Sequence, residues 1–208
     1  STLAEKLITE LVNYREHWGI ENVSVGISGG IDSAVTANLF KQAGWRVLPV
    51  MMSINQKSDE VDRGREVCEQ LGVTYVERDL TEMYEYNVKN MSEYHDGIDS
   101  DTHHGKIRRG NIRARLRMQT LYDFASQISG CVASTDNFSE LAAGFWTLHG
   151  DVGDIAPIQS LTKSWEVPKL AQHLGAPQSV IDAKPTDGLG IANGDEEQLG
   201  VSYLEFDI

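Results

Sequence analysis

The stretch that decides the fold is Val23-Ser24-Val25-Gly26-Ile27-Ser28-Gly29-Gly30-Ile31-Asp32-Ser33, residues 23–33 of 208. Its first five residues alternate apolar and small side chains, which predicts a buried strand. The glycine pair then breaks the strand, and residues 34–42 predict a helix. A strand that stops at two glycines and restarts as a helix leaves backbone N–H groups unpaired where the helix dipole favours an anion. The turn at 28–33 therefore predicts a site for a pyrophosphate group.

The side chains of this turn fit a phosphate ligand. Gly29 and Gly30 allow a phosphate to approach the backbone, Ser28 and Ser33 add hydroxyl donors, and Asp32 offers a carboxylate to a magnesium ion. The alternative is a tight turn in which a serine or the aspartate only caps the helix. The turn lacks the lysine and the spacing of a Walker A loop, and it is not G-x-G-x-x-G, so both of those nucleotide-binding classes are disfavoured.

The segments around this turn repeat the same alternation of strand and helix. A helix before the first strand is predicted by four apolar residues at helical spacing: Leu3, Leu7, Leu11 and Tyr14. Residues 47–52 and 73–77 predict two more strands, and between them a helix is expected from an N-cap at Ser58 to a stop at Gly72. Strands joined by single helices run parallel, so we expect an α/β fold: a doubly wound, Rossmann-like parallel sheet flanked by helices.

The middle of the chain has a weaker pattern. From Leu80 to Arg109 no apolar repeat stands out, and His95, His103 and His104 crowd among acidic residues. We expect a solvated surface excursion here, because these histidines lack metal-ligand spacing; a metal site is the alternative.

Regular elements return after residue 110. Residues 111–128 predict a helix, residues 130–135 a buried strand, and residues 164–174 and 178–183 two further helices. Three arginines in the first of these lie two residues apart, at 113, 115 and 117. That spacing spreads them around the helix axis, so they are not expected to form one patch.

Composition bounds the class of protein. A chain of 208 residues with 40% hydrophobic residues fits one domain, residues 1–208. A net charge of −13 gives no general attraction to nucleic acid or to an anionic membrane surface. Cys68 and Cys131 resemble buried apolar residues of a reduced, cytoplasmic protein, and residues 1–20 carry too many charges for a signal peptide or a membrane span.

A second group of polar residues follows the strand predicted at 130–135. Glu140 lies just beyond this strand end, where it could join Asp32 in holding magnesium; helix capping by Thr135 or Asp136 is the alternative. Lys163 and Thr186 could serve phosphate oxygens, or could be ordinary surface residues.

At this point the sequence resembles a known family, the ammonia-dependent NAD synthetases, which belong to the N-type ATP pyrophosphatases and have an adenine nucleotide alpha hydrolase-like fold. The motifs that carry the resemblance are SGGIDS at 28–33, GNIRARLRMQTLY at 110–122, STDNFSELAAGF at 134–145, HGDVGDIAPIQSLTK at 149–163 and KPTDGLGIANGDEEQLGVSY at 184–203. The first motif marks the superfamily, and the other four together single out NAD synthetase.

The resemblance implies a reaction: ATP-dependent amidation of deamido-NAD to NAD with ammonia, through an adenylated carboxylate, releasing AMP and pyrophosphate. It implies a homodimer with the substrate site at the interface and Mg²⁺ as the cofactor. It implies these residue roles: ATP at Gly26, Ile27, Ser28, Gly29, Gly30, Ile31, Asp32, Ser33, Thr135, Lys163 and Thr186; Mg²⁺ at Asp32 and Glu140; deamido-NAD at Arg115, Tyr122, Phe145, Asp154 and, as a weaker match, Tyr14; and catalysis at Lys163 and at Asp151, the ammonia-site carboxylate.

Three departures from the family pattern accompany this resemblance. Leu148 stands where many members have a basic residue that helps to bind deamido-NAD, and Met51-Met52 stands where some offer an arginine to the adenine. Family chains usually continue past the final Tyr-x-x-x-Asp into a basic tail, whereas this sequence stops at Ile208.

Two rival functions and the ammonia source follow from the same residues. One rival is another ATP pyrophosphatase that adenylates a nucleotide carbonyl or a tRNA base, although the acidic charge disfavours tRNA. The other is a module that senses ATP or AMP without chemistry. No glutaminase domain is expected, so ammonia would come from solution or from a partner.

Overall fold

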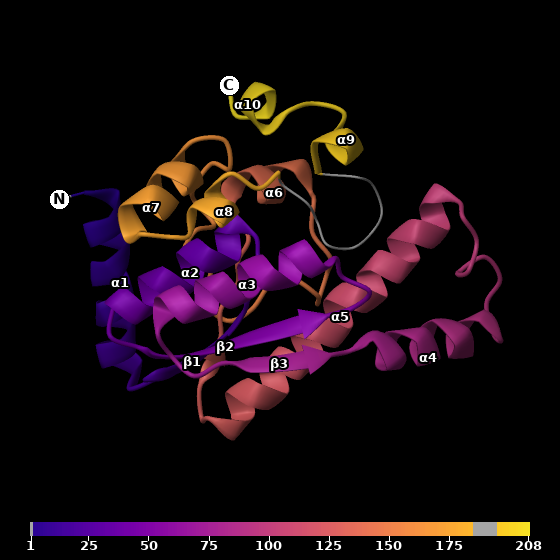
Figure 1. Cartoon of the computed structure of the whole chain (residues 1–208), viewed down its shortest axis with the longest axis horizontal. Helices are drawn as coiled ribbons and strands as arrows, with labels where there is room; N and C mark the ends of the chain where they lie inside the picture. Colours follow the sequence, from indigo (N-terminus) through magenta and orange to yellow (C-terminus); the bar gives the residue numbers. More distant parts are fainter. Residues whose placement is uncertain (1, 185–194) are drawn as a thin grey trace.

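The computed structural model describes residues 2–184 and 195–208 and arranges them as a parallel sheet between layers of helices (Figure 1). The elements are α1 (Leu3–Trp18), β1 (Asn22–Gly26), α2 (Ile31–Gln42), β2 (Arg46–Ser53), α3 (Ser58–Leu71), β3 (Val76–Asp79), α4 (Thr81–Ser92), α5 (His103–Gln127), β4 (Cys131–Val132), α6 (Phe138–Ala143), α7 (Glu166–Leu174), α8 (Gln178–Ile181), α9 (Asp195–Leu199) and α10 (Tyr203–Phe206).

The sheet has the strand order β3-β2-β1-β4, and every pair in it is parallel. In the central pair Val25 lies opposite Pro49, and on the next pair Val50 lies opposite Val76. Chain order reverses at β1, because β2 lies on one side of it and β4 on the other. The predicted β-α-β-α-β order is confirmed, and the point of reversal is where such sheets bind ligands, beyond the carboxyl ends of the strands.

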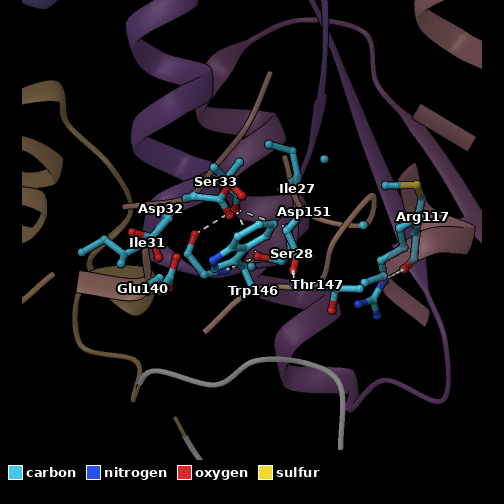
Figure 2. Close-up of a pocket in the computed structure, with 18 of the residues that line it drawn as sticks. Ile27, Ser28, Ile31, Asp32, Ser33, Arg117, Glu140, Trp146, Thr147 and Asp151 are labelled. Carbon is cyan, nitrogen blue, oxygen red and sulfur yellow. Dashed lines mark hydrogen bonds between the residues drawn. The ribbon is translucent and has the colours of Figure 1, made fainter. Parts of the chain in front are cut away.

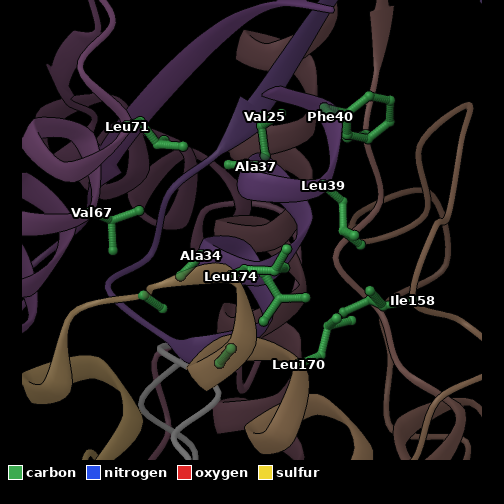
Figure 3. Close-up of a cluster of buried hydrophobic side chains, with 14 of the residues drawn as sticks. Val25, Ala34, Ala37, Leu39, Phe40, Val67, Leu71, Ile158, Leu170 and Leu174 are labelled. Atoms are coloured by element: carbon green, nitrogen blue, oxygen red, sulfur yellow. The ribbon is translucent and has the colours of Figure 1, made fainter. Parts of the chain in front are cut away.

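Each face of the sheet has its own hydrophobic core. One core packs β1 side chains such as Val23 and Val25 against α1, α2, α3, α7 and α8, with Phe40 and Leu39 of α2 fully buried (Figure 3). The other packs Val50 and Met52 of β2 against α4 and α5. Alternate residues of each strand point to opposite faces, which is why both faces can be apolar. The doubly wound α/β class is therefore confirmed.

Helix α3 illustrates how local sequence ends and begins an element. Gly72 follows it with φ +64°, and its N–H donates to the Cys68 and Glu69 carbonyls, so the predicted glycine stop is confirmed. Ser58 is not the N-cap as predicted. Lys57 has the extended cap conformation, and Ser58 is the first helical residue.

The segment from Leu80 to Arg109 differs most from the prediction. It contains all of α4, whose one buried residue is Tyr84, and the first turns of α5, which begins at His103 rather than at 111. A helix that buries so few side chains gives little apolar periodicity, which is why the sequence predicts a surface excursion there.

Two strands also differ in extent from the prediction. β3 runs from Val76 to Asp79, where it pairs with the end of β2, rather than over 73–77. β4 keeps only Cys131 and Val132, and the next residue, Ala133, forms an isolated parallel bridge with Ile155.

Both cysteines are buried and free, as predicted, and burial raises the pKa of each thiol to about 12. Of the helices in the described part of the chain, none has the length and apolar character needed to cross a bilayer.

Candidate active site

A cavity of about 420 Å³ opens beyond the carboxyl ends of β1 and β4. Its volume falls within the range of about 300–1,000 Å³ typical of small-molecule sites. Twelve of the predicted site residues line it: Gly26, Ile27, Ser28, Gly29, Gly30, Ile31, Asp32, Ser33, Thr135, Glu140, Asp151 and Lys163, together with Phe145 from the predicted dinucleotide set. The turn at 28–33 thus shares one cavity with the polar residues that follow β4.

The turn is held against helix α3 by close backbone packing. Gly29 has φ +81°, and a Cβ added there would lie 2.2 Å from the carbonyl oxygen of Glu60. Ser33 Oγ donates to the Gly30 carbonyl at 2.9 Å, and the Gly30 N–H donates to Ser28 Oγ at 3.2 Å. Only glycine fits at position 29, and the two serines order the loop before any ligand is present.

Lys163 lies between two carboxylates at one end of this cavity. Its ammonium group forms an ion pair with Asp32 and lies 3.6 Å from Oε1 of Glu140, and all three side chains are largely buried. Asn137 Nδ2 also donates to Asp32, at 3.2 Å. Burial raises the pKa of Glu140, and the neighbouring Lys163 opposes that rise. Two acids that converge on one cation can hold a divalent ion in its place.

Glu140 has a second contact that fixes its position. Asn137 is the N-cap of α6, and its side chain accepts from the Glu140 N–H at 3.0 Å, while Glu140 Oε2 accepts from the Asn137 N–H at 3.3 Å. This capping box corrects the alternative in which Thr135 or Asp136 caps the helix. One carboxylate oxygen of Glu140 therefore caps α6, and the other faces the cavity.

Two further aspartates line the middle of the cavity. Asp151 Oδ2 accepts from the Thr147 N–H at 2.5 Å. Asp136 is 8% exposed, and its Oδ2 has no hydrogen-bond partner among the described residues. Burial, with added repulsion from the Asp151 and Asp32 carboxylates, raises the pKa of Asp136 to about 7. The site thus gathers acidic side chains, which would stabilise a positively charged ligand.

Figure 2 shows how the labelled side chains divide the cavity: Ile31, Asp32 and Glu140 lie at one end, Arg117 lies at the other, and Trp146, Thr147 and Asp151 lie between them. Arg117 Nε donates to the Met52 carbonyl at 3.1 Å, which anchors it at the end of β2. Of the other two arginines in the predicted set at 113, 115 and 117, Arg115 contacts the Leu148 carbonyl and Arg113 stacks over Tyr84. The three point to different partners, as their spacing predicts.

Sequence reasoning missed several residues that line the site. Gln56 donates to the Ser28 carbonyl at 3.1 Å, and Arg63 donates to the Gly29 carbonyl at 3.4 Å. Gln56 also lines a neighbouring hollow of about 260 Å³ beside Met51 and Met52. The signal that could have found Gln56 is its place just after the predicted strand at 47–52, on the same sheet edge as the turn.

Comparison with known proteins decides the family. The NAD synthase family model matches residues 3–208. The chain belongs to the NAD synthase family. The NH(3)-dependent NAD(+) synthetase of Alkaliphilus metalliredigens is 37% identical over 206 residues, which cover 98% of this chain and 83% of that protein.

Solved structures agree with this membership. The NMN synthetase of Francisella tularensis superposes with a TM-score of 0.88 and 29% identity, covering 100% of this chain and 85% of that one. The NH3-dependent NAD synthetase of Campylobacter jejuni, solved with a nitrate ion, gives a TM-score of 0.74 and 29% identity over 86% of this chain and 74% of its own. The resemblance read from the motifs is therefore confirmed for the NAD synthase family.

The dinucleotide residues implied by the NAD synthase resemblance do not all line the cavity. Tyr122 OH donates to Asp154 at 2.9 Å, and Asp154 also accepts from the Val132 N–H. These two residues and Arg115 do not line the cavity within the described chain. Tyr14 lies on α1, where its ring stacks 6.4 Å from that of Trp45, so it does not reach the cavity either.

Thr186 and a metal site complete the set of features predicted for the NAD synthase site. Thr186 lies outside the described residues. Among residues 2–184 and 195–208, no group of three or more His, Cys, Asp or Glu side chains is placed to hold a metal, either at His95, His103 and His104 or in the cavity. Asp32 and Glu140 supply two carboxylates. Proteins commonly hold Mg²⁺ with one or two carboxylates when phosphate and water supply the remaining ligands.

Proposed function

We propose that this chain amidates the nicotinate carboxylate of deamido-NAD with ammonia, at the expense of ATP, and releases NAD, AMP and pyrophosphate. The observation that carries the proposal is the contact of Lys163 with both Asp32 and Glu140 beside the turn at 28–33. That end of the cavity has one ammonium group and two carboxylates that could bind a metal ion, and they lie next to a turn suited to an anion. These groups together suit a triphosphate with its metal ion. Membership of the NAD synthase family supports the same reaction.

The chemistry needs two steps, because a carboxylate is a poor electrophile. A carboxylate oxygen attacks the α-phosphorus of ATP, which forms a mixed anhydride and expels pyrophosphate. Lys163, turned from Asp32 toward the triphosphate, would neutralise charge on the leaving group. When bound by Asp32 and Glu140, Mg²⁺ supplies further positive charge against that group. Ser28, Ser33 and the backbone of the turn orient the phosphates.

Asp151 is the residue we assign to the second step. Ammonia is mostly ammonium at neutral pH, so a carboxylate in the cavity can bind the cation and accept its proton. The nitrogen then attacks the carbonyl of the anhydride, the bond to phosphate breaks, and AMP leaves. The Thr147 N–H, which donates to Asp151, holds this carboxylate in place.

One assay tests the proposal. The protein is incubated with ATP, MgCl₂, deamido-NAD and ammonium chloride, and NAD and pyrophosphate are followed together. We expect equal amounts of the two products. Pyrophosphate without NAD would favour another ATP pyrophosphatase, and ATP binding with neither product would favour the sensing module.

A second candidate differs in the substrate. The Francisella tularensis structure that superposes over this whole chain is an NMN synthetase, and an amidating enzyme that makes NMN would take nicotinate mononucleotide. Leu148, 57% exposed, stands where many family members have a basic residue for deamido-NAD. The same assay with nicotinate mononucleotide in place of deamido-NAD separates the two, because the preferred acid has the higher kcat/KM.

The assembly and compartment are proposed with the reaction. Large apolar side chains are exposed on α5, α6 and the loop beyond: Tyr122, Leu141, Trp146, Leu148 and Val152. A second copy that covered them would bring Tyr122 and Asp154 into an interface, which supports a homodimer. Sedimentation velocity tests this: a single species near 23 kDa would contradict it. The free thiols of Cys68 and Cys131 support a cytoplasmic location, to be tested by cell fractionation.

A further inference from the structure

The Asp207 side chain joins the segment around α10 to two segments that line the cavity. Its Oδ1 accepts from Ser139 Oγ at 2.6 Å, and its Oδ2 accepts from Ser164 N at 3.0 Å and from Ser164 Oγ at 2.6 Å. One carboxylate therefore takes three hydrogen bonds from two segments that are 25 residues apart. Bonds to a charged acceptor are shorter and stronger than neutral ones.

These two segments carry the cavity's ion pair. Ser139 precedes Glu140 in the first turn of α6, and Ser164 follows Lys163. Ser139 Oγ also accepts from the Lys163 N–H at 2.9 Å while it donates to Asp207. Asp207, Ser139 and the Lys163 backbone thus form one chain of hydrogen bonds, in which each bond fixes the direction of the next.

Tyr203, at the start of α10, adds a second contact to the same lysine. Tyr203 is 2% exposed, and its ring centroid lies 5.8 Å from Lys163 Nζ. An ammonium group over an aromatic face at that distance is stabilised by the ring's negative face. The segment 203–207 therefore contacts the ammonium group of Lys163 directly through Tyr203, and its backbone N–H indirectly through Ser139.

We propose that Asp207 is a positioning residue that sets the distance between Lys163 and Glu140 and so shapes the phosphate and metal end of the cavity. It touches no reacting atom itself. The proposal rests on the proposed function, because it gives Lys163 a role on the triphosphate.

The first test compares Asp207→Asn with Glu205→Gln. Glu205 caps the same short helix by accepting from Ser202, on its exposed side, so its variant controls for a loosened α10. An amide at position 207 can still accept from one side but presents N–H groups to the Ser164 donors. We expect Asp207→Asn to lower kcat/KM for ATP by about 10- to 100-fold, with KM for deamido-NAD within about threefold of wild type. Glu205→Gln should leave both parameters within about twofold.

A second measurement separates positioning from general loosening. ATP affinity is measured by calorimetry for Asp207→Asn in the wild-type and Lys163→Met backgrounds. If Asp207 acts through Lys163, the change weakens ATP binding by about tenfold in the first background and by less than about threefold in the second. Equal losses in both backgrounds, or no loss in either, would overturn the proposal.

Two controls allow this outcome to be interpreted. Thermal unfolding curves establish that each variant is folded at the assay temperature; if Asp207→Asn is not, Ser164→Ala, which removes one of the three bonds, is used in the same cycle. If the wild type binds ATP but makes no NAD, the proposed function fails, and the calorimetric cycle still decides the role of Asp207.

Discussion

Lys163 Nζ forms an ion pair with Asp32 across 131 residues of chain, in a position where both side chains are more than four-fifths buried. Glu140 Oε1 lies 3.6 Å from the same ammonium group. Under the proposed function, Asp32 and Glu140 would instead hold Mg²⁺, so binding of Mg²⁺ and ATP would displace Lys163 from Asp32 and leave its charge available to phosphate.

Replacement of Lys163 by methionine should expose this competition. The variant leaves Asp32 and Glu140 adjacent and without their shared cation, so we expect MgCl₂ alone to raise its melting temperature more than that of the wild type. NAD formation should fall by at least about 100-fold. Differential scanning fluorimetry over 0 to about 20 mM MgCl₂ measures the first effect. Lys169→Met, on the exposed side of α7, is the matched control, and an equal Mg²⁺ response in all three proteins would contradict the expectation.

The close packing at Gly29 gives a prediction about a single methyl group. Gly29 and Gly72 both have positive φ, but a Cβ at Gly72 would meet nothing within 4 Å, whereas one at Gly29 would lie 2.2 Å from the Glu60 carbonyl. Gly72→Ala should therefore cost about 1 kcal/mol of stability through backbone strain alone and leave ATP affinity unchanged. Gly29→Ala must move the turn away from α3, so it should also weaken ATP binding by at least about tenfold.

Urea unfolding and calorimetry with ATP check these two variants. The interpretation fails if Gly29→Ala binds ATP as tightly as the wild type, since the turn would then tolerate a displacement from α3. A parallel loss of ATP affinity in Gly72→Ala would point to general destabilisation instead.

The parallel sheet could be predicted because its strands and helices each bury a continuous apolar face. Val23 and Val25 lie on a strand whose pattern, glycine break and following helix are all local in sequence. Helix α4 could not be predicted in this way, because among its residues only Tyr84 is buried, and the weak apolar signal resembles that of a loop. The early turns of α5 bury Gly105 and Gly110, which carry no apolar side chain to mark a helix face.

The site residues differ in the same way: local sequence marks some of them, and only the packing of distant segments brings in the others. The turn at 28–33 could be predicted as part of a candidate site because its polar groups and glycines are contiguous, and Glu140 because it follows a strand end. Arg117 and Trp146 reach the cavity only through the packing of α5 against β1 and through the path of the loop after α6. The contact between Asp207 and Ser139 joins residues 68 positions apart in the sequence, and no local pattern predicts it.

Asp151 provides a test that separates the two chemical steps. Asp151→Asn can still accept from the Thr147 N–H but is a much weaker base, so we expect NAD formation to fall by about 100- to 10,000-fold. Adenylation precedes any role of this carboxylate, so exchange of labelled pyrophosphate into ATP, with deamido-NAD present, should stay within about threefold of wild type. Asp123→Asn, exposed on α5, should change neither rate. If pyrophosphate exchange fell as far as overall turnover, the assignment of Asp151 to ammonia would be wrong.

The buried carboxyl group of Asp136 makes stability depend on pH. Its pKa is raised to about 7 in the folded protein, mainly by burial, against about 3.9 in an unfolded chain. Between those values the folded state binds more protons than the unfolded state, so this group favours folding at low pH and its contribution is lost as pH rises from about 4 to about 7.

Asp136→Asn removes that titration while it keeps the shape of the side chain. The free energy of unfolding of the variant, relative to wild type, should therefore shift in its favour by about 2–4 kcal/mol between pH 4 and pH 8, since each unit of pKa difference corresponds to about 1.4 kcal/mol. Urea unfolding at four pH values measures the shift, with Asp101→Asn as the control, because the Asp101 side chain is 97% exposed. A difference between Asp136→Asn and wild type that stays constant over this range would mean that Asp136 is ionised in the folded protein throughout, and that a cation in the cavity compensates its charge.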